Sequence, residues 1–347
     1  MVLFPSVLKD TVSLGNQVLH CCWLRMVSLK DGIAIKAVSS HEYSAYFHDS
    51  WCIGSVPHGG YVTACFMQVA ETHFSKTLAQ QNQPHTIALH LEFVRRTEVG
   101  PATFKVRDVK LGRLASTIHI SLFQNGREEV LGYFIHADIP RESGPSFETH
   151  WSLEPPSAPA SISALAAGSD PNWAEQKAMP FAGFRKASQN VRFFFPRHGQ
   201  PHKGSIADEW IAMKSGEKFT NVSLGMVVDM FPQMIEAFRD DADPYAVEPD
   251  HNSAETESGL RKKGMAKFWY PTLLLNVDVK KALPEEGVDW LFLRTRAKQI
   301  KNGRFDIEVV VLDELGDIVA LSHHVCMVLP AERNLAQRRT GKTDLKL

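Results

Sequence analysis

Cysteine is scarce in this sequence of 347 residues, with five in all, and no two of them form a Cys-x-x-Cys pair. Their odd number, with no histidines at zinc-finger spacing, excludes a disulfide framework and a finger-type zinc site, and favours reduced thiols in a cytosolic compartment. Long apolar runs are also lacking, since the longest is far shorter than the roughly 20 residues that a membrane span needs. The sequence therefore predicts a cytoplasmic protein without a membrane partner.

A charge of one sign is missing as well. The chain has 38 basic and 39 acidic residues, for a net charge of -1. No basic field exists to hold a polyanion, so we expect no nucleic-acid partner. With 44% apolar and 22% charged residues the composition is that of a globular protein. Its length predicts two domains of roughly 110 to 150 residues each.

Targeting signals are weak at both ends. The start Met1-Val-Leu-Phe-Pro5 lacks the basic residues of a secretory leader. The end, Leu345-Lys346-Leu347, is similar to a peroxisomal signal with the wrong first residue, where a small one is expected. We therefore keep the cytoplasmic prediction and treat peroxisomal import as the minor alternative.

The chain contains a long-period internal repeat. The stretch 86–96, followed by a Gly-Arg pair at 112–113, reappears as the stretch 272–281, followed by a Gly-Arg pair at 303–304. The copies lie about 186 to 190 positions apart, far beyond the period of roughly 20 to 50 residues of a solenoid. Two copies of one domain are the better interpretation, and such copies usually pack face to face with a site between them.

The first copy predicts a helix followed by an antiparallel meander. Apolar residues over 62–73 cover a broad helical face after the Gly59-Gly60 turn. An Asn125-Gly126 pair between two apolar runs predicts a tight hairpin. Alternating segments predict strands, separated by Gly- and Pro-containing turns, at 85–95, 102–111, 114–124 and 129–138.

The second copy repeats this order with a longer insertion. We predict a strand at 191–195, a helix at 221–235 and further strands from about 266 to 328. A polar stretch between helix and strands reads as a mobile surface loop. The expected division is an appendage (1–30), domain 1 (31–140), a linker rich in Pro, Ser and Ala (141–181), domain 2 (182–332) with the loop insertion 239–263, and a tail (333–347).

Four motifs follow one another along the chain: Trp51 with Gly54, the stretch Pro57-His58-Gly59-Gly60-Tyr61, Leu111-Gly112-Arg113, and the stretch from Asp317 to His324. Their order resembles that of the double-hotdog acyl-CoA thioesterases. The resemblance covers roughly residues 30–140 and 182–332. It implies an α+β fold of two tandem hotdog domains, each an antiparallel sheet wrapped around a long central helix. It also implies cleavage of an acyl thioester without a metal or an organic cofactor.

The resemblance implies a water-activating trio of Asp, Gln and Ser or Thr in the second domain. An ungapped match places Asn276 at the Asp position, with Asp278 on the same side of the strand. It places the Gln position on or beside His324 and Gln299 nearest to the hydroxyl position. Because His323 and His324 must face opposite sides of their strand, one of them is expected to be idle, and we favour His324 for the site. Because Asn cannot take up a proton as a carboxylate does, we expect His324 to act as the base. Asp278 also has a plainer interpretation, as a surface ion pair with the lysines at 280–281.

Two more features are candidates for the site. Asp229 lies in an otherwise apolar stretch, where a buried carboxylate needs a partner, so it is either catalytic or bound to backbone donors near Pro232. The turn His58-Gly59-Gly60 brings backbone N–H groups and the positive end of a helix dipole to the place where an oxyanion would form. Its plainer interpretation is a tight helix entry, in which His58 only fills the turn.

Three classes of function remain open from the sequence. The leading one is hydrolysis of an acyl thioester carried by coenzyme A or by an acyl carrier protein, with the arginines at 95–96 or the lysines at 280–281 as candidates for holding phosphates. The second is a dehydratase, isomerase or cyclase that uses the same pocket. The third is a silent acyl-binding module. The chain is expected to be a monomer or a homo-oligomer of double hotdogs.

Overall fold

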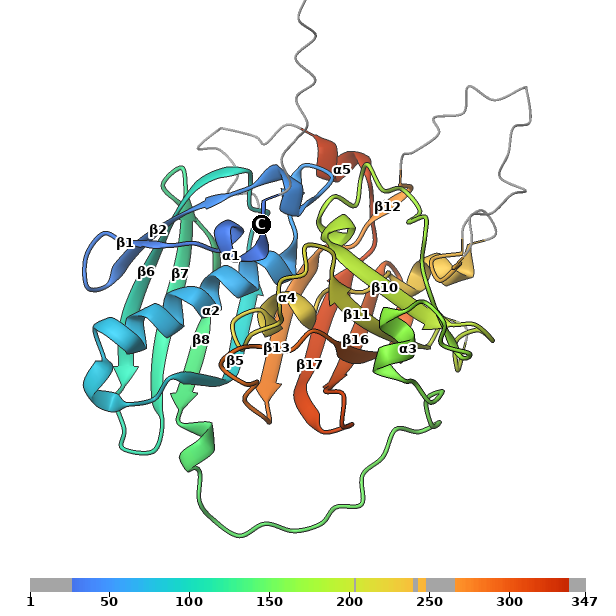
Figure 1. Cartoon of the computed structure of the whole chain (residues 1–347). Coiled ribbons are helices and arrows are strands. Elements are labelled where there is room, and N and C mark those ends of the chain that lie inside the picture. Colours follow the sequence, from blue (N-terminus) through green and yellow to red (C-terminus); the bar gives the residue numbers. More distant parts are fainter. Residues whose placement is uncertain (1–26, 203, 240–242, 248–265, 337–347) are drawn as a thin grey trace, which may run out of the picture.

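The computed structural model describes residues 27–202, 204–239, 243–247 and 266–336 (Figure 1). Most of the predicted appendage 1–30, most of the insertion 239–263 and the C-terminal tripeptide lie outside the described residues. The described chain is dominated by one antiparallel sheet of 14 strands. Along the sheet the order is β1-β2-β6-β7-β8-β5-β13-β17-β16-β14-β11-β10-β9, with β15 paired to β16.

The first half of the chain confirms the predicted helix and meander. Before the helix the structure adds α1 (Leu29–Gly32), a short helical turn (Asp49–Trp51) and the pair β3 (Cys52–Ile53) and β4 (Val56–Pro57). The helix α2 (Gly59–Lys76) crosses one face of the strands (Figure 1) and is followed by a turn at Ala79–Gln81. The strands are β1 (Lys36–Ala37), β2 (Glu42–Phe47), β5 (His85–Phe93), β6 (Gly100–Lys110), β7 (Ser116–Gln124) and β8 (Arg127–Ala137).

The helix α2 is held by apolar packing over most of its surface, because twelve of its 18 residues are buried. Phe66 shows this well: its ring meets that of Phe104 edge-on at 5.0 Å and stacks on that of Phe134 at 6.0 Å. The hairpin between β7 and β8 turns at Asn125 and Gly126, both with positive φ (52° and 73°), as a type I′ turn requires. That part of the prediction is confirmed.

The second half contributes the other strands of the sheet. They are β9 (Trp173–Glu175), β10 (Val191–Pro196), β11 (Ile206–Met213), β13 (Thr272–Val279), β14 (Leu291–Arg296), β15 (Ile300–Lys301), β16 (Arg304–Leu312) and β17 (Ile318–Met327), with β12 (Phe268–Trp269) paired to β18 (Leu329–Pro330). Strand β11 is an addition to the prediction. The stretch 141–181 is also more than a connector, since it holds α3 (Ile162–Ala166) and the edge strand β9.

The helix predicted at 221–235 is wrong. The structure has only α4 (Leu224–Val227), and a separate helical turn at Met234–Phe238. Pro232 explains the early end, because its ring would clash with the carbonyl of residue 228 and it has no N–H to donate. Among the described residues, a long central helix is thus present in the first half alone, and the second half has a short one at the equivalent place.

The two halves form one body. Strand β5 pairs with β13, so that Ala88 to Glu92 run antiparallel to Leu274 to Asp278 in a continuous sheet. On the covered face α4 packs against α2 so closely that a Cβ atom on Gly225 would lie 2.8 Å from the backbone nitrogen of Ala64. One hydrophobic core accordingly spans both halves. The final helix α5 (Glu332–Leu335) returns to the first half, where the Asn334 amide bonds to Ser55 and Ile53.

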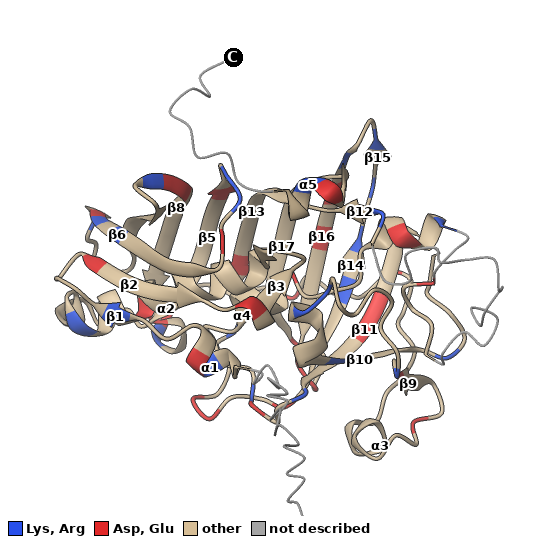
Figure 2. Cartoon of the chain, turned by 90° about the horizontal axis from the view of Figure 1, so that it is seen from above, with Lys and Arg blue, Asp and Glu red and all other residues tan. Residues whose placement is uncertain are grey.

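In the view of Figure 2, charged residues of both signs are interspersed along the described elements. Among the described residues, every helix is too short or too polar to cross a bilayer.

Candidate active site

A cavity of about 660 Å³ opens where the two halves meet. The start of α2 and the end of β5 form one wall, and the chain after α4 together with the start of β13 forms the other. Residues of both halves therefore line it, among them His58, Gly59, Phe93, Arg95, Arg96, Asp229, Phe231, Tyr270 and Thr272.

Asp229 is the carboxylate at the centre of this junction. Its side chain is 9% exposed, and its Oδ2 atom accepts a hydrogen bond of 2.7 Å from the N–H of Gly60. A Cβ atom on Gly59 would lie 2.8 Å from Asp229 Oδ2, and one on Gly60 would lie 2.8 Å from Asp229 Cβ. The glycine pair is therefore what lets the carboxylate reach the start of α2, where the positive end of the helix dipole stabilises its charge.

Two histidines flank this carboxylate. His58 Nε2 lies 3.6 Å from Asp229 Oδ2, and His324 Nδ1 lies 3.6 Å from Oδ1. His58 precedes α2 in the first half, whereas His324 comes from β17 in the second half. Among the described residues, the Nδ1 atoms of both rings are buried without a hydrogen-bond partner. The structure thus brings together five of the residues selected from the sequence, which are His58, Gly59, Gly60, Asp229 and His324.

His324 lies behind Asp229. It is fully buried, its Nε2 atom lies 3.0 Å from the Ser322 hydroxyl, and it is absent from the cavity wall. The ring of Phe231 stands edge-on to it at 6.0 Å. Burial lowers the pKa of His324, and the negative charge of Asp229 opposes this shift without cancelling it. His324 is therefore a neutral imidazole near pH 7 that contacts the carboxylate from the side away from the cavity.

The structure does not assemble the predicted group of His324 with Asn276, Asp278 and Gln299. Leu275 is the cross-strand partner of His324, whereas Asn276 is the partner of His323, so strand alternation turns Asn276 to the opposite face.

On that face Asn276 Oδ1 lies 2.8 Å from His90 Nδ1. Asp278 forms an ion pair with Lys280, as its plainer interpretation from the sequence predicts. Both Asn276 and Asp278 line a second hollow on the outer side. Gln299 is exposed before β15, where its N–H bonds to Asp306.

A hydroxyl group that the sequence prediction missed does lie in the cavity wall. Thr272, at the start of β13, pairs with Cys326 of β17, and their Oγ1 and Sγ atoms lie 3.6 Å apart. A register shift follows between Thr272 and Leu274. Because this irregularity reverses the alternation, counting by twos along β13 from Asn276 assigns Thr272 to the wrong face.

The two basic pairs differ in position. Arg95 and Arg96 both line the cavity, together with Arg127 and Arg333. Lys281 lies elsewhere and bonds to the carboxylates of Asp313 and Asp317. Of the two candidates for phosphate contacts, only the arginine pair is at the cavity.

Comparison with known proteins agrees with this architecture. The acyl-CoA thioesterase N-terminal domain family matches residues 47–137, and the corresponding C-terminal domain family matches residues 156–328. The thioesterase-like protein TwmA of Talaromyces wortmannii is 38% identical over 336 residues, which cover 89% of this chain and 94% of that protein.

Solved structures show the same fold. A crystal structure described as a putative thioesterase II from Thermobifida fusca is 20% identical, with a TM-score of 0.62 over 88% of this chain and 98% of the other. A hotdog-fold protein of unknown function from Alicyclobacillus acidocaldarius is 15% identical, with a TM-score of 0.63 over 87% and 97%. The double-hotdog architecture is confirmed, and the chain belongs to the acyl-CoA thioesterase family as an enzyme of the thioesterase hydrolase type.

Proposed function

We propose that the chain hydrolyses its acyl thioester in the cavity between the two halves, and that Asp229 activates the attacking water. The observation that carries this proposal is the position of Asp229. It is a buried carboxylate at the cavity wall, fixed by the Gly60 N–H and flanked by two histidines. A carboxylate held in this way is a competent acceptor for a proton of water.

In the proposed step the water oxygen attacks the thioester carbonyl carbon while Asp229 takes one water proton. The carbon–sulfur bond then breaks, the thiolate gains a proton, and the products are a carboxylic acid and a free thiol. His58 lines the cavity next to Asp229 and is suited to pass the proton to the leaving sulfur. Because the Gly60 N–H already donates a hydrogen bond to Asp229, the amide of Gly59, at the first helical position of α2, is the better donor for the oxyanion.

This assignment revises the trio that the family resemblance implied. The carboxylate is Asp229, not a residue at position 276. The hydroxyl is Thr272, and the Gln position is held by His324. Since His324 is buried behind Asp229, its proposed role is to position the carboxylate and not to act as the base.

The lining of the cavity favours a thioester with an apolar acyl group and an anionic carrier. Apolar side chains make up much of the wall, including Phe93, Phe184, Phe193, Phe231 and Trp269, and five arginines also line it. Acyl-CoA and acyl carrier protein share a phosphopantetheine arm, so arginines at the cavity suit either one. Assays with matched acyl groups on both carriers separate the two sources.

The test is release of thiol by the full chain, measured with a thiol-reactive dye. We expect Asp229→Asn to lower kcat by about 10²- to 10⁴-fold, because removal of a general base has this effect. Asp278→Asn is the matched control, since this carboxylate lies on the outer face. Full turnover by the Asp229→Asn enzyme would overturn the assignment.

One observation supports a dehydratase as the second candidate. Hotdog dehydratases use a histidine and an acid from facing domains, and here His58 and Asp229 come from opposite halves and lie 3.6 Å apart. Mass spectrometry of the products distinguishes the two reactions, because a dehydratase removes water from the acyl chain and leaves the thioester intact. A silent acyl-binding module predicts ligand protection in a thermal melt with no product of either kind.

A further inference from the structure

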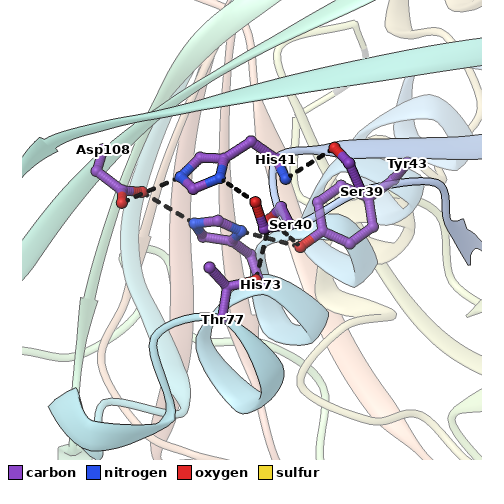
Figure 3. A network of polar contacts seen from close by, with 7 residues as sticks. All are labelled: Ser39, Ser40, His41, Tyr43, His73, Thr77 and Asp108. Carbon is purple, nitrogen blue, oxygen red and sulfur yellow. Dashed lines mark hydrogen bonds and ion pairs between the residues drawn. The ribbon is translucent and has the colours of Figure 1, made fainter.

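A second group of polar residues lies at the far end of α2, away from the cavity. His41, His73 and Asp108 come together there, and one ligand atom from each lies within 4.8 Å of the others (Figure 3). His58 and His73 are 15 positions apart along α2, which corresponds to about 22 Å at the helical rise. The group is therefore separate from the site of thioester cleavage.

Both imidazole rings present the same atom to the carboxylate. His73 Nε2 lies 2.9 Å from Asp108 Oδ1, and His41 Nε2 lies 3.2 Å from Asp108 Oδ2. Figure 3 shows the two rings pointing toward Asp108, and their centroids are 4.9 Å apart. Nitrogen and oxygen ligands at about 2.0–2.1 Å from a tetrahedral zinc ion lie about 3.3 Å from each other. The two contacts to Asp108 are already near this spacing, whereas the three ligand atoms as a group lie within 4.8 Å, so the ring nitrogens would have to approach each other by up to about 1.5 Å to hold an ion.

The opposite ring nitrogens are fixed by hydroxyl groups. His41 Nδ1 lies 2.8 Å from Ser40 Oγ, and His73 Nδ1 lies 2.9 Å from the Tyr43 hydroxyl. Histidines that bind a metal usually have their other nitrogen held by a polar partner in this way, which sets the ring orientation and the tautomer.

The partners of His73 allow a metal-binding tautomer. The Tyr43 hydroxyl lies 2.9 Å from His73 Nδ1 and 3.2 Å from the Ser40 carbonyl oxygen, to which it can donate. When the hydroxyl accepts the Nδ1–H of His73, Nε2 keeps a lone pair 2.9 Å from the Asp108 oxygen, and a cation between the two would satisfy both acceptors.

We propose that His41, His73 and Asp108 bind a divalent transition-metal ion, with Zn²⁺ as the best match for two imidazoles and one carboxylate. The side chains of His41 and Asp108 are 43% and 26% exposed, so water can reach the fourth position. No thioester chemistry is assigned to this ion, and the expectation of metal-free hydrolysis concerns the cavity alone.

The ion would join three elements of the first half. His41 lies in the turn between β1 and β2, and His73 lies in the last turns of α2. Asp108 lies on β6 beside a register shift, where a bulge re-aims the side chain. The proposed role is an anchor for the C-terminal end of α2 on the sheet, so zinc should raise the Tm of the protein.

The test measures zinc binding by the full chain after removal of metals with EDTA. Titration calorimetry should show one zinc ion per chain, and Co²⁺ in its place should give visible absorption bands of a low-symmetry site. Asp108→Asn and His41→Ala should each weaken zinc binding more than about tenfold. His90→Ala is the matched control, because His90 is a similarly exposed histidine beside a carboxylate in the same half.

Two outcomes would overturn the proposal. One is wild-type protein that binds no equivalent of zinc, and the other is zinc affinity in both variants equal to that of wild type. If Asp108→Asn does not fold in EDTA, the half-exposed His41→Ala variant decides the result. The readouts are independent of thiol release, so failure here leaves the proposed hydrolysis standing.

Discussion

At the scale of single residues, the approach of Asp229 to the helix start depends on two positions without a side chain. Gly60→Ala would place a Cβ atom 2.8 Å from both Asp229 Cβ and the Met226 carbonyl oxygen. Backbone atoms cannot move away easily, so we expect a loss of about 1–3 kcal/mol of stability and a large loss of turnover. Urea unfolding at pH 7 and thiol release measure the two effects.

The control for this substitution is Gly183→Ala, because a Cβ atom there would meet nothing within 4 Å. It should change stability by less than about 0.5 kcal/mol. Equal stability loss in the two variants would show that the contact between α2 and Asp229 is not as tight as described.

His324 offers a residue-scale test between two roles. If His324 is the base, as the sequence predicts, His324→Gln and His324→Leu should lose activity to the same extent. A positioning residue behind Asp229 predicts a graded result, because the Gln amide keeps a polar contact to the carboxylate and Leu does not. We expect kcat within a few-fold of wild type for Gln and at least about tenfold lower for Leu, with little change in KM. Equal and complete loss in both would favour His324 as the base.

At the scale of elements, the sequence predicts structure well where one period continues without interruption. The strands of the first meander and the helix that begins at Gly59 have clear alternation or helical spacing, and they were found within a few residues. The region 221–235 misleads because its apolar residues suit a long helix, whereas Pro232 ends it early. The site was mispredicted for a similar reason. Counting by twos along β13 from Asn276 places Thr272 on the outer face, but the irregularity between Thr272 and Leu274 turns the Thr272 side chain to the cavity.

The cross-strand pair of β11 and β14 makes an element-scale prediction. Arg294 bonds to Asp208 with both its Nε and an Nη atom at 2.6 and 2.7 Å, and both side chains are buried. Arg294→Met would leave a buried carboxylate without its partner, so we expect a loss of about 3–5 kcal/mol in urea unfolding. Lys298→Met is the control, because its pair with Glu308 is largely exposed and should contribute less than about 1 kcal/mol. Similar losses in the two variants would contradict the role of burial.

At the scale of the whole molecule, the two halves share one sheet and one core, and the proposed active site exists only where they meet. His58 and Gly59 belong to the first half, whereas Asp229 and Thr272 belong to the second. The sequence repeat predicts two copies that pack face to face with a site between them, whereas in the structure the copies join edge to edge through the strands β5 and β13 of one sheet. The cavity wall is not predictable in the same way, since it depends on turns and irregularities that differ between the halves.

The stability of the whole molecule should fall on mild acidification, because buried histidines must remain neutral in the fold. The pKa of His136 is lowered to about 3, mainly by burial; the hydrogen bond to the Gln83 carbonyl opposes this shift, and the nearby His85 adds to it. Unfolded histidine has a pKa near 6.5, so between about pH 3 and 6.5 the unfolded chain binds the extra proton and the free energy of unfolding decreases as pH falls.

From pH 7 to 5 this one residue should cost about 2 kcal/mol. His136→Asn removes that contribution, so its urea midpoint in EDTA should depend less steeply on pH than that of wild type. His85, His119 and His324, whose pKa values burial also lowers, keep part of the slope in the variant. Identical slopes for the two proteins would show that His136 takes up a proton within the folded state.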